Sequence, residues 1–326
     1  MIITRTPLRI SFAGGGSDLK EYYLKYGGSV LSTAIDKYIY LSMHPYFKAN
    51  KYFLKYSQNE LVNNVNDINH RIIKQVFIDH KISGVDFNSS ADIPSGTGLG
   101  SSSSFTVGLT KLCCAYNNQY LGIEDIAKYA CDVEIEKLNE PIGKQDQYAC
   151  AVGGLNFIKF CQNDNVIVEK IAIEKNKLNR LQDNLMMFYL GNTRSASNIL
   201  SEQKTNTLND EKKIDNLHKM VQLSIELKNE LLLGNIDSMG DILHRGWIYK
   251  KELASKISNP QIDIYYNLAM KNGALGGKLL GAGGGGFLLF YAHERNHNQI
   301  RLALNHLEEL NFNFSFEGTK ILHYDN

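Results

Sequence analysis

The first part of the chain alternates hydrophobic and polar residues in the manner of β-strands. Segments 1–12 and 30–43 are rich in Ile, Val, Tyr and Thr, which favour extended backbone. Short helices are predicted at 19–26, between these strands, and at 71–80, within a polar, Asn-rich stretch. The sequence VDFNSSADIP then predicts an extended segment that leads into a glycine-rich turn.

Helical spacing begins directly after that turn. Apolar residues recur every three or four positions from Phe105 to Tyr116, which predicts a helix that starts at or near Ser101. A second helix is expected over about 123–138, followed by two strands with the sequences GGLNFIKF and NVIVEKIAI.

Long amphipathic helices dominate the second half of the chain. LMMFYL, at 185–190, predicts a buried strand before them. The helices are expected at about 210–233, 235–256 and 260–272. GGKLLGAGGGGFLLFYA follows, and a last helix and strand end the pattern. The composition divides the chain into predicted domains at 1–178 and 179–326.

Length and charge limit the classes of function. At 326 residues the chain is long for one ordinary domain and suits two domains that share a cleft. Its 35 basic and 34 acidic residues leave a net charge of +1, which offers no general attraction for nucleic acid or an anionic membrane. A small anionic ligand would therefore be held by local groups.

Cysteine spacing and apolar segments indicate a reduced, cytoplasmic setting. The five cysteines form no CxxC pair and no Cys/His cluster, so neither a disulfide framework nor a zinc site is expected. The N-terminus lacks the apolar core of a signal peptide, and no stretch approaches the ~20 apolar residues that span a bilayer. We expect a cytoplasmic protein.

The most informative stretch runs from Pro94 to Ser104, with the sequence PSGTGLGSSSS. Gly96, Gly98 and Gly100 allow a tight turn and a close approach of the backbone to a ligand. Four serines then occupy the first turn of a helix, where free N–H groups and the dipole favour an anion and a hydroxyl can ligate magnesium. The simpler alternative, a flexible loop with an N-cap, needs only one serine. The stretch therefore predicts a phosphate site.

Three familiar nucleotide-binding motifs do not fit the sequence. A Walker A loop requires Lys before the Ser/Thr, and Gly100 stands there instead. Segment 281–286, GAGGGG, matches G-x-G-x-x-G, but the dinucleotide-binding fingerprint opens a helix, whereas this segment leads into the strand-like FLLFY. The HRD and DFG motifs of protein kinases do not occur in the sequence.

Two further segments carry candidate side chains. The segment Gly14-Gly15-Gly16-Ser17-Asp18 follows the strand that contains Arg9, and taken alone it is equally well a simple turn. Proline and glycine end the helix that carries Glu134, which places Asp146 on a loop or at the start of the next element. A helix cap explains Asp146 equally well, and a solvated helix face explains Glu134.

The order of these segments resembles the galactokinase, homoserine kinase, mevalonate kinase and phosphomevalonate kinase (GHMP) superfamily. PLRISFAGGGSD, PSGTGLGSSSS, GKQDQ and KLLGAGGGGFLLF occur in that order and span nearly the whole chain. Together with TRSAS and SKISNP they are similar to the bacterial D-glycero-D-manno-heptose 7-phosphate kinase branch. The resemblance implies a two-domain α+β fold: an N-terminal ribosomal-protein-S5-like domain, a ferredoxin-like α/β C-terminal domain, and an active site in the cleft.

The resemblance also implies roles for individual residues. The phosphates of ATP would lie on the serine-rich loop, at Pro94, Gly96, Gly98, Leu99, Gly100, Ser101, Ser102, Ser103 and Ser104. Ser102 and Glu134 would ligate Mg²⁺, with Glu136 as the alternative if the register is shifted. Asp146 would act on the acceptor hydroxyl, by positioning it more than by full proton removal, with Arg9 beside it.

The acceptor site implied by the resemblance draws on three segments. Its residues would be Gly15, Gly16, Ser17, Asp18, Arg194, Gly283 and Gly284. Galactokinases have Glu-His where this chain has Gly15-Gly16, and the smaller residues would suit a bulkier or anionic acceptor. Arg194 could hold a second phosphate, although a surface arginine in a capping loop explains it equally well. The expected product is a heptose 1,7-bisphosphate for nucleotide-activated heptose and surface glycans.

Two alternatives remain beside this expectation. A kinase for an unphosphorylated sugar such as fucose would lack the second-phosphate pocket. A member of the superfamily that has lost catalysis would be a binding module, although such decay should first remove Asp146, Glu134, Arg9 and the serines, all of which are present. The expected partner is a small-molecule sugar phosphate, without nucleic acid or membrane.

Overall fold

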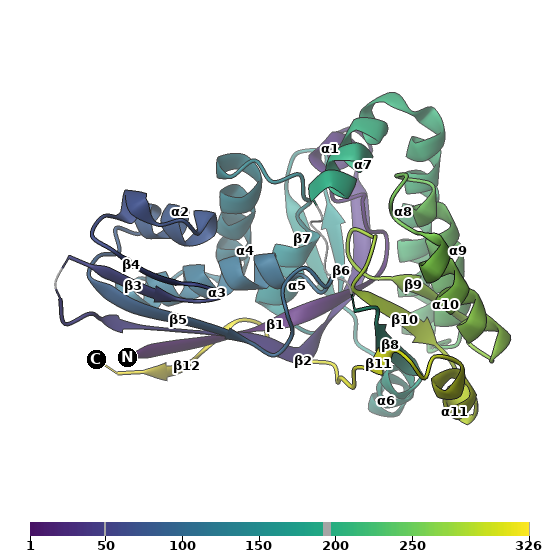
Figure 1. Ribbon diagram of the computed structural model, residues 1–326. Helices are drawn as coiled ribbons and strands as arrows, with labels where there is room; N and C mark the ends of the chain where they lie inside the picture. Colours follow the sequence, from purple (N-terminus) through teal and green to yellow (C-terminus); the bar gives the residue numbers. More distant parts are fainter. Residues whose placement is uncertain (49, 192–196, 326) are drawn as a thin grey trace.

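The computed structural model describes residues 1–48, 50–191 and 197–325. The predicted α+β class is confirmed, because an eight-stranded sheet and a four-stranded sheet each carry helices (Figure 1). The two ends of the chain lie side by side at one end of the larger sheet (Figure 1). Within the three described ranges, no helix is long and apolar enough to cross a membrane.

The larger sheet is organised around one long strand. Its members are β1 Ile2–Ala13, β2 Gly28–Pro45, β3 Tyr52–Lys55, β4 Asn59–Val62, β5 Val85–Ala91, β6 Leu155–Phe160, β7 Val166–Lys170 and β12 Lys320–Tyr324. The long strand β2 is rich in β-branched and aromatic residues, which favour a pleated backbone. It pairs antiparallel with β1 over most of its length, with β6 along its first half and with β5 along its second half. One strand therefore joins both parts of the sheet.

The structure adds one hairpin and one long-range strand pairing to the predicted pattern. β3 and β4 form a hairpin that the sequence did not predict, since in β3 the buried Tyr52 and Leu54 alternate with the less buried Phe53 and Lys55 over only four residues. β12 pairs with β1 although the two strands lie at opposite ends of the sequence. The division between 1–178 and 179–326 stays a prediction, with the addition that β12 extends the first sheet.

Most helices of the first half contact one long helix, α3. The helical elements of this half are α1 Lys20–Tyr26, the 3₁₀ turn η1 Val65–Asp67, α2 Arg71–Asp79, α3 Ser101–Tyr116, α4 Ile123–Cys131, the π-helical turn η2 Asp132–Lys137, and α5 Gln145–Val152. α3 begins at Ser101 as predicted and lies against β1, β2, α4 and α5 (Figure 1). The single helix predicted over 123–138 is α4 followed by η2. This wider turn carries Glu134, whose side chain is fully buried.

The second half places long helices beside the smaller, antiparallel sheet. Its elements are α6 Lys175–Asp183, β8 Leu185–Tyr189, α7 Ser197–Asn209, α8 Glu211–Leu233, α9 Ser238–Lys251, α10 Pro260–Lys271, β9 Gly276–Leu279, β10 Phe287–Tyr291, α11 Glu294–Ala303 and β11 Glu308–Glu309. Asp210 caps α8 by accepting from Lys213 N at 3.3 Å, and Asn259 caps α10 just before Pro260. α8 contacts both β1 and β2 and so fastens the second half to the larger sheet.

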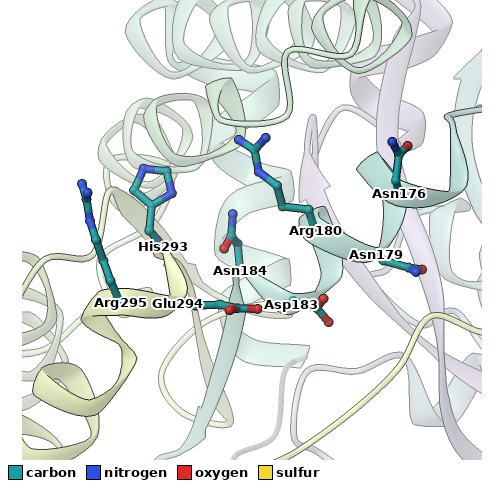
Figure 2. A pocket seen from close by; sticks show the side chains of 8 residues that line it. All are labelled: Asn176, Asn179, Arg180, Asp183, Asn184, His293, Glu294 and Arg295. Atoms are coloured by element: carbon teal, nitrogen blue, oxygen red, sulfur yellow. The ribbon is translucent and has the colours of Figure 1, made fainter.

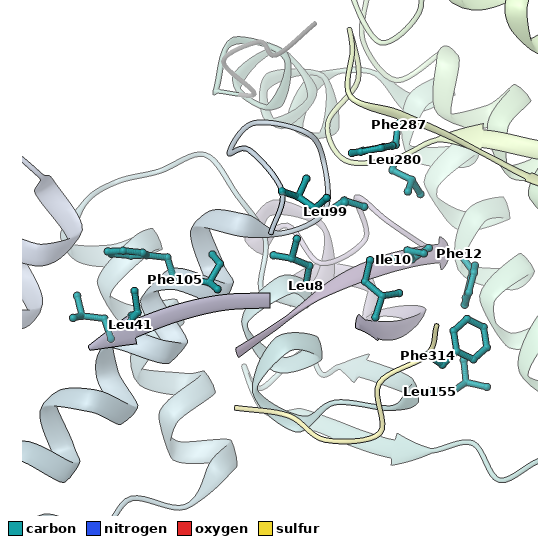
Figure 3. Packing of buried hydrophobic residues seen from close by; sticks show 14 of the residues in the cluster. Leu8, Ile10, Phe12, Leu41, Leu99, Phe105, Leu155, Leu280, Phe287 and Phe314 are labelled. Carbon is teal, nitrogen blue, oxygen red and sulfur yellow. The ribbon is translucent and has the colours of Figure 1, made fainter. Parts of the chain in front are cut away.

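One hydrophobic core runs through both halves of the molecule. Leu8 and Ile10 of β1 lie close to Leu99 of the serine-rich loop (Figure 3). Leu280 and Phe287, from the glycine-rich segment of the second half, belong to the same cluster. Burial of one leucine side chain contributes about 1.5–3 kcal/mol. Packing therefore holds the two glycine-rich segments against each other.

Candidate active site

A cleft of about 440 Å³ lies between the two halves. From the first half it is lined by β1, by Gly15, Gly16 and Asp18, and by the serine-rich loop, η2 and α5. From the second half it is lined by α7, α8, α9, β9 and residues 281–282. Segments that are far apart in the sequence thus supply one site.

The serine-rich loop turns on three glycines. Gly96, Gly98 and Gly100 have φ values of 77°, 85° and 76°, in the left-handed region that glycine adopts without a steric penalty. α3 begins after Gly100, and its first backbone bond runs from Ser104 N to Gly100 O at 2.9 Å. The N–H groups of residues 101–103 lie outside that ladder, at the positive end of a 16-residue helix. This geometry suits a phosphate group.

The predicted ATP-binding residues fall into two groups. One group lines the cleft and consists of Gly96, Gly98, Gly100, Ser101, Ser102 and Ser103. The other group lies on the side of the loop away from the cleft. Leu99 and Ser104 are fully buried, and Pro94 lies outside the cleft lining. The Ser104 hydroxyl donates to Thr6 O at 3.2 Å, and the Pro94 carbonyl accepts from Thr97 Oγ1 at 3.1 Å. These three residues position the loop.

Ser102 and Glu134 lie next to each other at the cleft. The Ser102 hydroxyl donates to Glu134 Oε1 at 2.7 Å, and Gln147 Nε2 donates to the other carboxylate oxygen at 2.7 Å. Burial raises the pKa of Glu134 to about 6, although these hydrogen bonds act in the opposite direction. Glu136 instead forms a surface ion pair with Lys20 at 2.8 Å. The observed register therefore brings Glu134, and not Glu136, to the serine-rich loop.

Arg9 joins Asp146 to the serine-rich loop. Its Nε and Nη2 donate to the two oxygens of Asp146 at 2.7 and 2.6 Å, and its Nη1 donates to Gly98 O at 2.8 Å. Burial lowers the pKa of Arg9, but the charge and hydrogen bonds of Asp146 outweigh it, so the net change is upward. A bidentate pair fixes distance and orientation together. Asp146 therefore lies one side chain away from the glycine turn.

Asp18 is held by backbone and amide donors. Its carboxylate accepts from Gly16 N at 2.9 Å, Gln145 Nε2 at 2.9 Å and Gln145 N at 3.3 Å. Burial, helped by the charge of Asp146, raises the pKa of Asp18. A Cβ at Gly143 would lie 2.0 Å from Asp18 Oδ2, so only glycine fits beside this carboxylate. Asp18 is thus firmly positioned at the wall of the cleft.

Two buried oxygens at the cleft have no hydrogen-bond partner in the described part of the chain. They are Ser11 Oγ and Gln145 Oε1. Both lie beside Gly15, since a Cβ there would be 3.6 Å from the first and 3.9 Å from the second. Buried polar groups are normally satisfied. A ligand rich in hydroxyl groups would supply the missing partners.

The glycine-rich segment of the second half meets the serine-rich loop backbone to backbone. A Cβ on Gly281 would lie 2.4 Å from Gly98 Cα, and a Cβ on Gly286 would lie 2.3 Å from Thr97 O. Gly281 and Ala282 line the cleft. This contact closes the cleft next to the expected phosphates.

Other predicted acceptor residues are placed away from the cleft lining. Gly283 and Gly284 pack against Ile257, whose carbonyl accepts from Gly284 N at 2.9 Å. Ser17 is fully buried, and its hydroxyl donates to Gly14 O at 2.8 Å, which stabilises the turn before Asp18. Arg194 falls in 192–196, outside the described residues.

Sequence reasoning missed two lysines in the cleft lining, Lys250 and Lys278. Lys278 lies in the apolar strand GGKL, and a lysine flanked by glycine and leucine in a buried strand is a usable signal. Lys250 lies in the run YKKE near the end of α9, which reads as an ordinary solvated helix face. Only the fold reveals that its side chain is buried.

A second hollow lies between α6 and the start of α11 (Figure 2). Its lining residues are Asn176, Asn179, Arg180, Asp183, Asn184, His293, Glu294 and Arg295. Arg180 forms an ion pair with Asp237, and Asn184 donates to the Tyr291 hydroxyl at 2.9 Å. The partners of both, Asp237 and Tyr291, lie outside this lining, and none of the predicted site residues that the structure describes lies in the hollow. The cleft between the halves is the candidate active site.

Comparison with known proteins gives a consistent result. Models for the GHMP kinases N terminal domain and the GHMP kinases C terminal region match residues 59–154 and 227–309. A D-glycero-alpha-D-manno-heptose 7-phosphate kinase of Campylobacter jejuni is 33% identical, and the match covers 98% of each chain. A galactokinase of Pyrococcus furiosus is 25% identical, with 87% of each chain covered. The crystal structure of a D-glycero-D-manno-heptose 1-phosphate kinase from Bacteroides thetaiotaomicron shares the fold, with a TM-score of 0.81, 24% identity and 100% coverage of both chains.

Proposed function

Because the chain belongs to the GHMP kinase family and is a sugar kinase that uses ATP as phosphate donor, we propose that its acceptor is D-glycero-D-manno-heptose 7-phosphate. The enzyme would phosphorylate the anomeric C1 hydroxyl and release the 1,7-bisphosphate, for nucleotide-activated heptose and surface glycans. The full-length similarity to the Campylobacter jejuni enzyme supports this acceptor. The cytoplasmic location expected from the sequence is part of the proposal.

The observation that carries the proposal is the double contact of Arg9. One guanidinium binds both oxygens of Asp146 and the carbonyl of Gly98. The carboxylate expected at the acceptor hydroxyl and the loop expected at the ATP phosphates are therefore held at a fixed separation. Placement of this kind is the main requirement of phosphoryl transfer.

In the proposed reaction the acceptor hydroxyl oxygen forms a bond to the terminal phosphorus of ATP, and the bond from that phosphorus to ADP breaks. The N–H groups at the start of α3 bind the phosphates. Asp146 accepts the hydrogen bond of the hydroxyl and receives its proton as the new bond forms. Because Arg9 already binds both carboxylate oxygens, Asp146 contributes more by orienting the hydroxyl than by its basicity.

Ser102 and Glu134 are the residues that would hold Mg²⁺. No group of three or more His, Cys, Asp or Glu side chains suited to a metal occurs among residues 1–48, 50–191 and 197–325. Mg²⁺ bound with a nucleotide does not need such a group, since one or two carboxylates, water and phosphate oxygens complete its shell. The carboxylate and the hydroxyl, 2.7 Å apart, are ligands of this type. When bound, Mg²⁺ would neutralise charge on the phosphates.

Glu134→Gln should raise the Mg²⁺ concentration needed for half-maximal activity by at least about 10- to 100-fold. The amide keeps the shape of the side chain and can still accept from Ser102, but it carries no charge. The measurement is initial rate against Mg²⁺ concentration at saturating ATP. Glu136→Gln, on the exposed side of the same turn, is the control and should behave as wild type. An unchanged Mg²⁺ dependence in Glu134→Gln would contradict the metal assignment.

The acceptor is tested by incubating the protein with Mg-ATP and single sugars and locating new phosphate by phosphorus NMR. Heptose 7-phosphate, heptose 1-phosphate, free heptose, fucose and galactose form the panel. We expect an anomeric phosphate resonance with heptose 7-phosphate and little turnover of the free sugars. Turnover of fucose instead would support a kinase for an unphosphorylated sugar. Absence of ATP turnover with every sugar would support a binding module.

Arg194→Ala should raise KM for the sugar phosphate while leaving KM for ATP unchanged. A bidentate arginine–phosphate contact contributes about 1.5–3 kcal/mol, which corresponds to roughly a 10- to 100-fold change. Lys204→Ala, which removes a cation of α7 already paired with Glu21 at 2.8 Å, is the control. Equal losses for both substrates would indicate a structural role for Arg194.

A further inference from the structure

Two buried lysines face the cleft with an unusual set of partners. Lys250 and Lys278 are 9% and 5% exposed. Lys250 Nζ donates to Leu279 O at 2.9 Å and to Gly281 O at 2.5 Å. Lys278 Nζ donates to Ser11 O at 2.8 Å and to Phe12 O at 3.0 Å. An ammonium has three donors, so each retains one beyond these two bonds.

Neither ammonium has a carboxylate partner within the described part of the chain, since all the hydrogen bonds of both go to backbone carbonyls. Burying a cation without an opposite charge is unfavourable. Neighbouring positive charges add to the cost: Arg9, whose own partner is Asp146, acts on the pKa of both lysines, and Lys250 also acts on the pKa of Lys278. Burial, followed by the effect of Arg9, lowers the pKa of Lys250 to about 7, and burial lowers that of Lys278 as well.

The position of Lys250 indicates what the missing charge is. Lys250 donates to the carbonyl of Gly281, and the backbone of Gly281 contacts the backbone of Gly98 in the serine-rich loop. Arg9 holds the carbonyl of Gly98 from β1. Cations from the two halves of the molecule therefore flank the same glycine turn, beside the start of α3.

We propose that Lys250 and Lys278, together with Arg9, form a cationic wall of the cleft that binds a phosphoryl group. The inference rests on the proposed function and extends it to two residues that received no role from the sequence, Lys250 in α9 and Lys278 at the start of the KLLGAGGGGFLLF segment. Two phosphoryl groups are available in the reaction: the one that leaves ATP and the one that the acceptor already carries. Without a phosphoryl contact, the two lysines would only tie β9 and residue 281 to their neighbours.

The test compares Lys250→Met, Lys250→Arg and Lys278→Met with Lys251→Met. Lys251 is the adjacent residue, lies nearer the surface, and binds Asp263 at 3.3 Å, so it is a matched control. Binding of a non-hydrolysable ATP analogue and of inorganic tripolyphosphate is measured by calorimetry, and thermal unfolding is followed in parallel. Steady-state kinetics use a phosphorylated and an unphosphorylated acceptor.

Loss of one charged hydrogen bond to phosphate should change binding or turnover by about 10- to 100-fold in Lys250→Met, and by less in Lys250→Arg. A fall in kcat with both acceptors would show that the lysines bind the phosphoryl group that leaves ATP. A rise in KM for the phosphorylated acceptor alone would show that they bind the phosphate already present. Unchanged phosphate binding and kinetics in folded Lys250→Met and Lys278→Met, whatever their melting temperatures, would overturn the proposal.

Proton uptake provides a second readout that a structural role would not change. At about pH 8 most Lys250 side chains are neutral in the free protein, and a bound anion favours the ammonium, so binding should take up a proton. Calorimetry in buffers of different ionisation enthalpy measures this uptake, which should be smaller in Lys250→Met than in the wild type. Lys278, Glu134 and His70 also line the cleft with shifted pKa values and remain in both proteins, so the difference between the two proteins reports Lys250. Because this assay requires no turnover, it tests the lysines even if no sugar on the panel is phosphorylated.

Discussion

Asp146→Asn should lower kcat by about 10²–10⁴-fold and leave KM for ATP nearly unchanged. The carboxylate is the group that would orient the acceptor hydroxyl and receive its proton, and the amide cannot do the latter. ATP is expected on the serine-rich loop, and Arg9 links that loop to Asp146 by hydrogen bonds to both. The loss should therefore appear in turnover and not in nucleotide binding.

The kinetic result needs a control for indirect effects, because an amide offers Arg9 only one good acceptor in place of two. Thermal unfolding and calorimetric binding of an ATP analogue report whether Arg9 still holds Gly98. Asp164→Asn is the matched variant, since Asp164 forms a comparable ion pair with Lys144 outside the cleft lining. Wild-type kcat in Asp146→Asn would remove this residue from the catalytic role.

Local pattern explains which parts of the fold could be predicted. α3 and its start at Ser101 follow from glycines and serines placed directly before an apolar repeat. The start of α10 follows from Asn259 and Pro260, a cap and a first-turn proline. β12 could not be predicted to join the larger sheet, because its partner β1 is about three hundred residues away and only the closed fold brings them together. The hairpin of β3 and β4 is too short to show a period.

The residues of the candidate site also divide into those that local sequence indicates and those that only the folded chain reveals. The serine-rich loop could be recognised from its own composition. Arg9 and Asp146 are assigned only from the resemblance that several segments carry in their order along the chain. The choice between Glu134 and Glu136 depends on the π-helical turn, and spacing in the sequence does not reveal such a turn. Lys250 looks like a surface residue until the backbone carbonyls of β9 and Gly281 enclose its ammonium.

Gly281→Ala should destabilise the protein and weaken ATP binding together. Gly281 has φ +71°, and a non-glycine residue in that region costs about 1–3 kcal/mol. In addition, its Cβ would lie 2.4 Å from Gly98 Cα. Because this Cβ is fixed to the Cα of residue 281 and Gly98 Cα is a backbone atom, one of the two glycine-rich segments must move. The Gly98 carbonyl that Arg9 binds would move with it. Each 1.4 kcal/mol lost from binding raises the dissociation constant about tenfold.

Gly27→Ala separates the effect of a positive φ on stability from the effect of the contact between Gly281 and Gly98 on ATP binding. Gly27 has nearly the same φ, +72°, but a Cβ there would meet only Phe160 O, at an ordinary 3.7 Å. This variant should therefore show the backbone penalty in thermal unfolding with unchanged affinity for an ATP analogue. Gly281→Ala should show at least as large a loss of stability and also a loss of affinity of about tenfold or more. If both variants bound the analogue equally well, the contact between Gly281 and Gly98 would have no part in shaping the phosphate site. The second half would then contribute to ATP binding only through its side chains.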